Sequence, residues 1–346
     1  MPRRKPGTRI LAVDPAQPAT ETIAVAAAAL RSGRLVAFPT ETVYGLGANA
    51  LDPYAVAGIF TAKGRPAHNP VIVHVPDADA AAALGSAWSE VCRQLAAVFW
   101  PGPLTLVTPR SAVVPDIVTA GGPTVALRVP SHLVAQALLH AAGVPVAAPS
   151  ANRSSRISPT TAEHVRAELG GLVHIILDGG PTECGLESTV VDCTLPMPRI
   201  LRPGPISPSQ IALALGLAPD SISAVDQHGE GPLRSPGMLP RHYAPQAQVI
   251  VVPAAAAHDA VRSAVEAGLA VGWLTMSGST AVASARLHAI RMPDAAAGYA
   301  HLLYAALRAL DARSVDRIVV DDPPSGEDWL AVHDRLSRAA APADRV

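Results

Sequence analysis

Two cations stand close together on a turn that follows a predicted helix. Lys63 and Arg65 flank Gly64, and Pro66 comes next. A planar guanidinium and a compact ammonium on a constrained turn suit the oxygens of a polyphosphate. The same pair would also complete the C-terminus of a helix against its dipole, which is a common structural role. The pattern therefore indicates either a phosphate site or a helix end.

A second polar loop follows the predicted strand that ends at Phe38. Two hydroxyls and a carboxylate occupy 40–42, and two glycines follow them. Loops at the ends of strands are where α/β sheets place ligands. A plain polar turn with capping residues would give the same pattern. His74 interrupts the apolar stretch 71–75, where a lone histidine is more often a satisfied core residue than a functional one.

A third polar segment, 149–160, precedes another predicted helix. It contains a run of hydroxyls, one amide and two arginines. Hydroxyls and backbone N–H groups at the start of a helix can hold an anion. A capped surface loop is the alternative.

Helix and strand patterns alternate along 1–214, which predicts an α/β domain. We expect helices at 20–31, with Thr20 as the N-cap, and at 53–63, 86–100, 131–142 and 160–169. We expect strands at 35–38, 71–75, 104–108, 125–129, 146–148, 173–177 and 189–192. Because several of these strands follow one another without a helix between them, the sheet should be mixed rather than purely parallel.

The segment 215–247 differs in composition from the rest of the chain. Asp, Ser, His, Gly and Pro dominate it, and it shows no periodicity. Such a long structureless segment should separate two domains or serve a function. From 248 to 346 strand and helix patterns return, which predicts a small three-layer parallel domain. This domain has no glycine-rich nucleotide motif, so no nucleotide site of its own is indicated.

Composition excludes several classes of protein. Hydrophobic residues make up 49% and charged residues 16% of the chain, which excludes a disordered protein. Lys and Arg number 27 against 28 Asp and Glu, so the chain is not a globally basic nucleic-acid binder. Aromatic residues, at 3%, argue against a base-stacking platform. Three cysteines without a CxxC pair, and no long uncharged apolar run, predict a cytoplasmic protein without a membrane span.

Eight stretches, in this order and spacing, resemble the YrdC-like family of threonylcarbamoyl-AMP synthases in its long form with an extra C-terminal domain. They are PTETVYGLGANA (39–50), KGRPAHNPVIVHV (63–75), WPGPLTLV (100–107), TVALRVPSH (124–132), APSANRSSRISPT (148–160), GLESTVVD (185–192), ILRPGPIS (200–207) and SPGMLPRHYAP (235–245). The resemblance implies a twisted mixed sheet around a concave cavity in 1–214, a linker that acts as a lid in 215–247, and a Rossmann-like domain in 248–346.

The resemblance also implies a reaction. L-threonine, bicarbonate and ATP give threonylcarbamoyl-AMP and pyrophosphate, and the product serves the t6A modification at position 37 of tRNA through a downstream transfer complex. By motif position, L-threonine is expected at Thr42, His74, Arg128, Ala148 and Ser188. ATP is expected at Arg65, Asn69, Thr124, Ser150, Ser158, Arg202 and Tyr243.

Carbamate and ATP are both anions, so their reaction requires positive charge around them. Lys63 and Arg65 are the expected catalytic cations, and Arg128 should pair with the carboxylate of threonine. No Asp, Glu and His cluster has the spacing of a metal cage, so Mg²⁺ is expected mainly on the phosphates and on water. Tyr243 resembles the residue that folds over the nucleotide in long-form members.

Two other functions compete with this interpretation. A module that binds RNA in a basic cavity would need no chemistry and no lid motif at 235–245. A carbamoyltransferase would usually add paired cysteines and an acylphosphatase segment, and the chain has neither.

Overall fold

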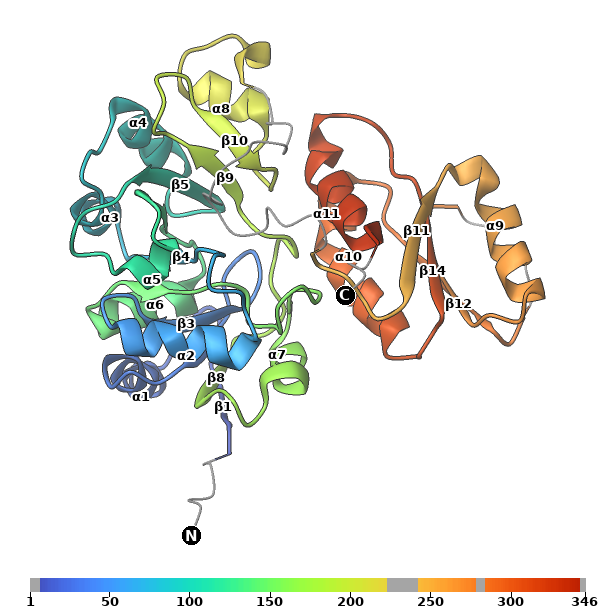
Figure 1. The fold of residues 1–346 in the computed structure, drawn as a ribbon, viewed down its shortest axis with the longest axis horizontal. Helices are drawn as coiled ribbons and strands as arrows, with labels where there is room; N and C mark the ends of the chain where they lie inside the picture. Colours follow the sequence, from blue (N-terminus) through green and yellow to red (C-terminus); the bar gives the residue numbers. More distant parts are fainter. Residues whose placement is uncertain (1–6, 223–241, 278–283, 343–346) are drawn as a thin grey trace. The chain divides into compact units, whose positions relative to one another are not determined.

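The computed structural model describes residues 7–222, 242–277 and 284–342 (Figure 1). The chain forms two compact units. The larger unit comprises Met1–Ser154, Ser158–Glu183 and Glu187–Met238, and the smaller comprises Ser155–Ile157, Cys184–Leu186 and Leu239–Val346. The expected boundaries after 214 and 247 stay predictions, because most of the linker lies outside the described residues.

The larger unit is built on a ten-stranded sheet with the order β1-β8-β2-β3-β7-β4-β6-β5-β9-β10. Its strands are β1 (Arg9–Ala12), β2 (Val36–Phe38), β3 (Gly45–Asn49), β4 (Ile72–His74), β5 (Leu104–Pro109), β6 (Thr124–Arg128), β7 (Val146–Ala147), β8 (Ile175–Asp178), β9 (Thr189–Asp192) and β10 (Arg199–Arg202). The β4–β6 and β5–β9 pairs are parallel, whereas β4–β7 and β5–β6 are antiparallel. The predicted mixed sheet is confirmed.

Helices cover both faces of this sheet. They are α1 (Thr20–Arg31), α2 (Pro53–Lys63), α3 (Ala78–Leu84), α4 (Glu90–Phe99), α5 (Asp116–Thr119), α6 (Leu133–Ala142), α7 (Ala162–Leu169) and α8 (Pro208–Ala214), with a 3₁₀ turn at Pro219–Ser221. Side chains of β2 alternate between the faces: Val36 and Phe38 pack with α1 and α6, and Ala37 packs with α2.

The predicted helix 53–63 has both of its ends specified locally. The Asp52 side chain accepts hydrogen bonds from the N–H groups of Tyr54 and Ala55, and Pro53 occupies the first helical position. Gly64 ends α2 in the left-handed conformation, with φ of 62°. This C-cap places Lys63 in the last turn and starts the turn that carries Arg65.

The smaller unit contains a four-stranded parallel sheet with the order β11-β14-β12-β13. Its strands are β11 (Gln248–Val252), β12 (Val271–Thr275), β13 (Leu287–Arg291) and β14 (Arg317–Asp321). Its helices are α9 (Ala254–Glu266), α10 (Ala296–Asp311) and α11 (Leu330–Ala340), with a 3₁₀ turn at Glu327–Trp329. In Figure 1, α9 lies on one side of the strands, and α10 and α11 lie on the other. This confirms the predicted three-layer parallel domain.

Several predicted details differ from the structure, among them unpredicted strands β1 and β10 and unpredicted helices α3, α5 and α8. The helix expected at 86–100 begins at Glu90, because the Ser89 side chain caps it by accepting from Cys92 N. Helix α1 starts as expected, but its N-cap is Ala19 rather than Thr20. Strand β3, which carries two glycines, was expected to be loop. Among the described residues, no helix has the length and apolar character that crossing a membrane requires.

Candidate active site

Arg128 and His74 occupy neighbouring positions on the larger sheet. Each is the last residue of its strand, β6 and β4, and the parallel pairing of these strands sets the two residues opposite each other. Both side chains are buried. The carboxyl ends of parallel strands meet at one edge of a sheet, which is where α/β folds place ligands. Two residues predicted for L-threonine are therefore side by side.

The loop after β2 brings a hydroxyl and a carboxylate to Arg128. Nη1 of Arg128 donates to Oγ1 of Thr42 at 2.8 Å, and Nη2 of Arg128 lies 2.8 Å from Oε1 of Glu41. Glu41 and Arg128 are each 3% exposed, so little water screens their charges. Thr42 thus joins Arg128 as predicted, together with Glu41, which the site prediction omitted.

Thr40 gives this loop its shape. Its Oγ1 accepts hydrogen bonds from the N–H groups of Thr42 and Val43, both at 3.2 Å, and donates to the Val43 carbonyl at 2.6 Å. Because that proton goes to Val43, the Thr42 hydroxyl donates to Thr40 at 2.8 Å and accepts from Arg128. Thr42 Oγ1 keeps one lone pair with which it can accept from a ligand.

Polar atoms without hydrogen bonds gather at this group. Four buried atoms of this group have no hydrogen-bond partner among the described residues: Oε1 and Oε2 of Glu41, Nη2 of Arg128 and Nδ1 of His74. Glu41 and Arg128 therefore form an ion pair whose geometry does not satisfy a hydrogen bond. Buried polar groups are normally hydrogen-bonded, so this concentration of unfilled capacity indicates a position for a polar ligand.

The imidazole of His74 is neutral near neutral pH. Burial and the positive charge of Arg128 lower the pKa of His74 to about 3. Its ring packs edge-on against Phe38, with 6.2 Å between ring centroids. A neutral ring adds no charge to the site and can donate or accept one hydrogen bond at Nδ1, according to its tautomer.

Ser188 and Arg202 form a second polar group at the β9–β10 end of the sheet. Arg202 donates from Nε and Nη2 to the Ser188 carbonyl oxygen, at 3.1 and 2.9 Å, and from Nη2 to Ser188 Oγ at 3.1 Å. Oγ1 of Thr105 lies 2.8 Å from the same hydroxyl. A residue predicted for L-threonine is thus in direct contact with one predicted for ATP.

Gly204 allows the chain to pass close behind Ser188. A Cβ at position 204 would lie 2.5 Å from the Ser188 carbonyl carbon and 2.8 Å from the carbonyl oxygen of Glu187. Only glycine permits this approach, so the backbone at 204 helps to set the position of the Ser188 hydroxyl.

Lys63 points into the protein. The side chain is buried, and its Nζ donates to the carbonyl oxygens of Ser150 and Asn152 and to Asn152 Oδ1 at 3.4 Å. Burial and the charge of Arg65 lower the pKa of Lys63. The ammonium form of lysine has three N–H groups, and three oxygens lie within hydrogen-bonding distance of Nζ. Lys63 therefore ties the end of α2 to the loop that carries Ser150.

Arg65 braces its own turn in a similar way. Its Nε donates to the Asn69 carbonyl at 3.0 Å, and its Nη2 donates to Asn69 Oδ1 and to the Pro70 carbonyl, both at 2.6 Å. Asn69 is fully buried, and its Nδ2 has no acceptor among the described residues. The structure thus brings Arg65 and Asn69 together, and the role of both in holding ATP stays a prediction.

Ser158 joins the site through a carboxylate. Its Oγ donates to Oε1 of Glu187 at 2.5 Å, and both side chains are buried. Glu187 directly precedes Ser188 in the chain. Residues predicted for the two different substrates are therefore connected through Glu187, which the prediction did not include.

The segment 147–150 runs between β3 and β4. The Ala148 N–H donates to the Ile72 carbonyl at 2.8 Å, two residues before His74. Ser150 forms a β-bridge with Gly45. A Cβ on Gly45 would lie 3.3 Å from Ala148 Cβ, so the two segments pack tightly. The Ala148 N–H is thus bonded to the strand that carries His74, and its backbone contact with threonine stays a prediction.

Thr124 lies at the other end of β6 from Arg128. It starts the strand and pairs with Pro109. Thr124 is four residue steps before Arg128 along the strand, a distance of about 13 Å at 3.3 Å per residue. A ligand that touched both would have to span the strand, so the structure does not bring Thr124 into the group around Arg128.

Tyr243 belongs to the smaller unit. Its ring stacks on Tyr304, with 5.8 Å between centroids, and the Arg335 guanidinium lies 5.0 Å from its centroid. Tyr243 is buried and has φ of 60°, a left-handed conformation that is unfavourable for a bulky side chain. Its expected contact with ATP stays a prediction, and Arg241 and most of the 235–245 motif lie outside the described residues.

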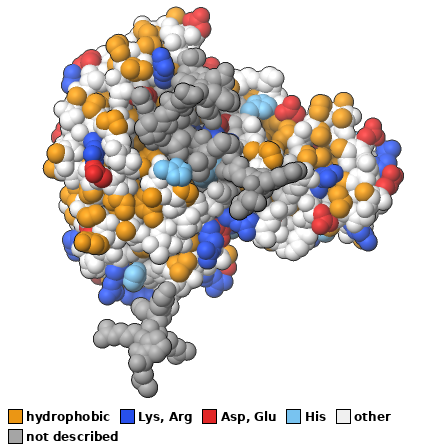
Figure 2. Space-filling model, viewed as in Figure 1, with side chains coloured by type: hydrophobic (Ala, Val, Ile, Leu, Met, Phe, Trp, Pro, Cys, Tyr) orange, Lys and Arg blue, Asp and Glu red, His pale blue; other side chains and the backbone are white. Residues whose placement is uncertain are grey.

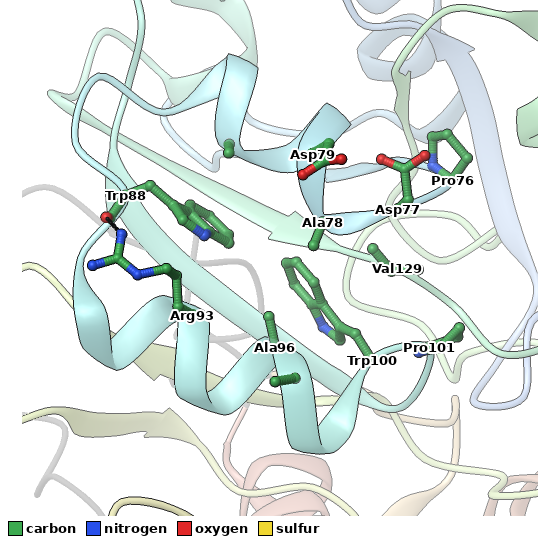
Figure 3. Close-up of a pocket in the computed structure, with 12 residues that line it drawn as sticks. Pro76, Asp77, Ala78, Asp79, Trp88, Arg93, Ala96, Trp100, Pro101 and Val129 are labelled. Atoms are coloured by element: carbon green, nitrogen blue, oxygen red, sulfur yellow. Dashed lines mark hydrogen bonds between the residues drawn. The ribbon is translucent and has the colours of Figure 1, made fainter.

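A groove of about 440 Å³ opens beside the edge of the sheet (Figure 3). Trp88 and Trp100 form one wall, with ring centroids 6.0 Å apart, and Asp77 and Asp79 face them. The Arg93 guanidinium donates to the Trp88 carbonyl at 3.0 Å. None of the described residues that line the groove was predicted to bind L-threonine or ATP, so we assign neither substrate to it.

Sequence reasoning missed Thr40, Glu41 and Glu187 as individual site residues. All three stand inside the quoted stretches, next to predicted residues. A carboxylate between two threonines is a visible signal, since isolated carboxylates are rarely buried without a partner. The partner, Arg128, is far away in sequence, and only the folded sheet shows it.

Family models match both units of the chain. The model Sua5_yciO_yrdC, described as "Telomere recombination", matches residues 28–204. The model Sua5_C, described as "Threonylcarbamoyl-AMP synthase, C-terminal domain", matches residues 206–341. Together the two models account for the eight resembling stretches from 39–50 to 235–245.

Curated relatives and a solved structure match over almost the full length. The chain is 43% identical to the threonylcarbamoyl-AMP synthase of Pyrococcus abyssi, over 92% of this chain and 94% of the relative. It is also 43% identical to the Bacillus subtilis threonylcarbamoyl-AMP synthase, over 92% of each chain. The crystal structure of P. abyssi Sua5 complexed with L-threonine matches with a TM-score of 0.89 and 41% identity, over 96% of this chain and 98% of that one. The chain therefore belongs to the threonylcarbamoyl-AMP synthase family, in the two-domain form with the Sua5 C-terminal domain.

Proposed function

We propose that this chain synthesises L-threonylcarbamoyl-AMP from L-threonine, bicarbonate and ATP. The amine of threonine combines with bicarbonate to give a carbamate and water, and a carbamate oxygen then attacks the α-phosphorus of ATP. The bond to the β-phosphate breaks, and pyrophosphate leaves. The observation that carries the proposal is the buried group of Arg128, Glu41, Thr42 and His74, with its unfilled polar atoms, in a chain of which 92% matches an enzyme of this name.

The group around Arg128 is suited to an amino acid. The guanidinium has N–H groups in a planar fork that matches a carboxylate. Thr42 Oγ1 retains an accepting lone pair, and neutral His74 offers a further polar atom. Ala148 and Ser188 supply backbone and hydroxyl contacts nearby. A solved relative, P. abyssi Sua5, is complexed with L-threonine, which supports threonine as the substrate here.

We place ATP along the remaining predicted residues. Arg65 and Asn69 share one turn, and Ser188 connects Arg202 to the threonine side of the site. Ser150 and Ser158 supply hydroxyls from the loop 148–160. Thr124, at the far end of β6, would meet a distant part of an extended nucleotide. We also propose that Tyr243 contacts the nucleotide.

Catalysis in this arrangement rests on positioning two anions and on neutralising charge. The carbamate and the α-phosphate repel each other, so fixed cations lower the free energy of the state in which they meet. Arg65 and Arg202 are the cations that we assign to the phosphates. Lys63 acts through the loop, because its Nζ is occupied by the Ser150 and Asn152 carbonyl oxygens.

We propose that Mg²⁺ enters on ATP as part of the substrate. Mg²⁺ prefers phosphate oxygens and water, and proteins usually add only one or two carboxylates. In the described part of the chain, no group of three or more His, Cys, Asp or Glu residues could hold a metal. Bound this way, Mg²⁺ would neutralise charge on the leaving pyrophosphate.

We propose that a downstream complex uses the product and transfers its threonylcarbamoyl group to tRNA. Both acidic and basic side chains appear on the visible face of the larger unit (Figure 2), and the whole chain carries 27 Lys and Arg against 28 Asp and Glu, a balance that suits a small-molecule enzyme better than a globally basic RNA binder. We propose that the enzyme acts in the cytoplasm, as its three cysteines without a CxxC pair suggest.

Pyrophosphate release from ATP tests the proposal. We expect release to depend on L-threonine and on bicarbonate together, and threonylcarbamoyl-AMP to appear in the same reaction by mass spectrometry. Release without threonine would indicate a simple ATPase, and use of carbamoyl phosphate in place of bicarbonate would indicate a carbamoyltransferase. No release, combined with tight binding of RNA, would favour the RNA-binding module instead.

A further inference from the structure

Glu41 is a buried carboxylate that the assigned roles leave unexplained. It is 3% exposed, and neither of its oxygens has a hydrogen-bond partner among the described residues. A buried charge normally requires both a counter-ion and hydrogen bonds, because it has lost its water. Glu41 has the counter-ion, Arg128 at 2.8 Å, but not the hydrogen bonds.

The same is true of the atom that faces it. Nη2 of Arg128 lies within contact distance of Glu41 Oε1 without a hydrogen bond, whereas Nη1 of Arg128 is fixed by Thr42. Two opposite charges therefore stand side by side, and each keeps hydrogen-bonding capacity. If the pair served only to neutralise Arg128, we would expect the aligned geometry that Arg–carboxylate pairs usually adopt.

An amino acid has the complementary arrangement of charges. Its α-carboxylate and α-ammonium are attached to the same carbon, so they too stand side by side with opposite signs. A carboxylate of the ligand can accept from Arg128, and an ammonium beside it can donate to Glu41. Because each contact joins opposite charges in a site that water screens little, both are charge-assisted hydrogen bonds, about twice as strong as neutral ones.

We propose that Glu41 binds the α-ammonium of the amino-acid substrate while Arg128 binds its carboxylate. This assignment rests on the proposed function, since it takes an amino acid as the substrate. It makes Glu41 a substrate-binding residue that recognises the ammonium form of the substrate and fixes its position. The ammonium then releases one proton, and the neutral amine combines with bicarbonate. The side-chain hydroxyl of threonine is left for the neutral groups of the site.

A ligand pair tests this on the unmodified, full-length protein. (R)-3-Hydroxybutanoate is L-threonine with the ammonium replaced by hydrogen, and it keeps the carboxylate and the hydroxyl. We expect calorimetric titration near neutral pH to show that it binds about 10- to 100-fold more weakly than L-threonine, the range for one charge-assisted hydrogen bond. Binding within threefold of L-threonine would overturn the assignment without any variant.

Glu41→Gln tests the residue itself, because glutamine keeps the shape and removes the charge. We expect L-threonine to bind about 10- to 100-fold more weakly to Glu41→Gln, and 3-hydroxybutanoate to bind as it does to the wild type, so that discrimination between them disappears. The matched control is Glu163→Gln, an exposed carboxylate on α7, which should leave both affinities unchanged. Equal weakening of both ligands would show that Glu41 only positions Arg128, and would overturn the assignment.

Folding and function can be separated in this design. Glutamine at 41 leaves Arg128 buried without a counter-ion, which is strongly destabilising, so circular dichroism should accompany each titration. If Glu41→Gln does not fold, the wild-type ligand pair decides alone. If pyrophosphate release is normal but L-threonine and 3-hydroxybutanoate bind equally well, the assignment of Glu41 is wrong and the proposed function stands. A wild type that prefers L-threonine but releases no pyrophosphate would remove the proposed function and keep Glu41 as an amino-acid ligand.

Discussion

Two parts of the larger unit bury positive charge in opposite ways. Arg128 meets a carboxylate and a hydroxyl, and its Nη2 keeps unfilled hydrogen-bonding capacity among the described residues. Lys63, on the turn after α2, gives its N–H groups to oxygens of its own chain. Both side chains are buried, and the sequence motifs assign both to the reaction.

This difference distinguishes a cation that can bind a ligand from one that holds two segments of the chain together. A cation whose donors are filled by backbone carbonyls holds two segments together, and it can reach a ligand only by breaking those bonds. A cation with unfilled donors beside a buried carboxylate can take a ligand without such loss. We therefore expect the group around Arg128 to govern threonine, and Lys63 to govern the loop that carries Ser150.

The largest expected effect comes from removing the cation of the ligand group. Arg128→Met should lower kcat/KM for threonine by about 10³-fold or more, because it removes the carboxylate partner and leaves Glu41 buried alone. Threonine-dependent pyrophosphate release measures this, with circular dichroism as the control for folding. A folded Arg128→Met variant with kcat/KM for threonine within tenfold of the wild type would contradict the assignment of Arg128 to ligand binding.

Removing the supporting cation should act mainly on stability. Lys63→Met keeps the aliphatic stem and leaves the Ser150 and Asn152 carbonyls without their donor. We expect the free energy of unfolding to fall by about 1–3 kcal/mol, the cost of unsatisfied buried groups. Urea denaturation measures the change, and exposed Arg93→Met provides a control in the same unit. Unchanged stability with lost turnover would show that Lys63 faces the phosphates after all.

Arg65 tests whether the turn after α2 also touches ATP. We expect Arg65→Ala to cut turnover by about 10²-fold while the protein stays folded, as expected for loss of a cation that stabilises charge on the phosphates. The readout is kcat and KM for ATP at saturating threonine. Near-normal turnover would leave Arg65 with its contacts to Asn69 and Pro70 as its whole role.

The amino-acid side chain sharpens the account of the threonine group. L-serine lacks one methyl, which an apolar niche distinguishes by about 10- to 200-fold in kcat/KM. L-valine lacks the hydroxyl and should be rejected more strongly if neutral groups such as Thr42 hydrogen-bond it. Competition assays with the three amino acids measure both ratios. Equal use of valine and threonine would mean that the pocket is assigned wrongly.

The smallest expected effect is the pH dependence that His74 imposes on stability. Its pKa is about 3 in the folded protein, against about 6.5 in an unfolded chain. Below about pH 6.5 the unfolded chain binds a proton at His74 that the folded protein does not. The free energy of unfolding therefore decreases as the pH is lowered, by up to about 1.4 kcal/mol per pH unit.

His74→Gln removes this titration. Urea denaturation between about pH 6.5 and pH 4.5 should therefore show a flatter loss of stability in the variant than in the wild type. Burial also lowers the pKa of His132 and His174, so some acid sensitivity should persist. An identical slope in both proteins would show that His74 is protonated in the folded state.

Local signals explain which parts of the fold were predictable. Helix α2 has the predicted bounds because its caps, Asp52 and Gly64, act within one turn of its ends. Strand β3 was not predicted, because its glycines give no strand signal. Its conformation comes from pairing with β2 and β7, and a Cβ on Gly47 would lie 2.9 Å from both Phe38 and Val146. That requirement exists only once the neighbouring strands are in place.

For the site, the sequence alone determined the residue types and the family, because both are carried by motifs of adjacent residues. Only the tertiary structure decided which charges meet. Arg128 and Glu41 are far apart in the sequence but in contact in the fold, and the same is true of Lys63 and the Ser150–Asn152 loop. A cation's role depends on whether its donors are already filled, and that depends on contacts that form only when distant segments fold together.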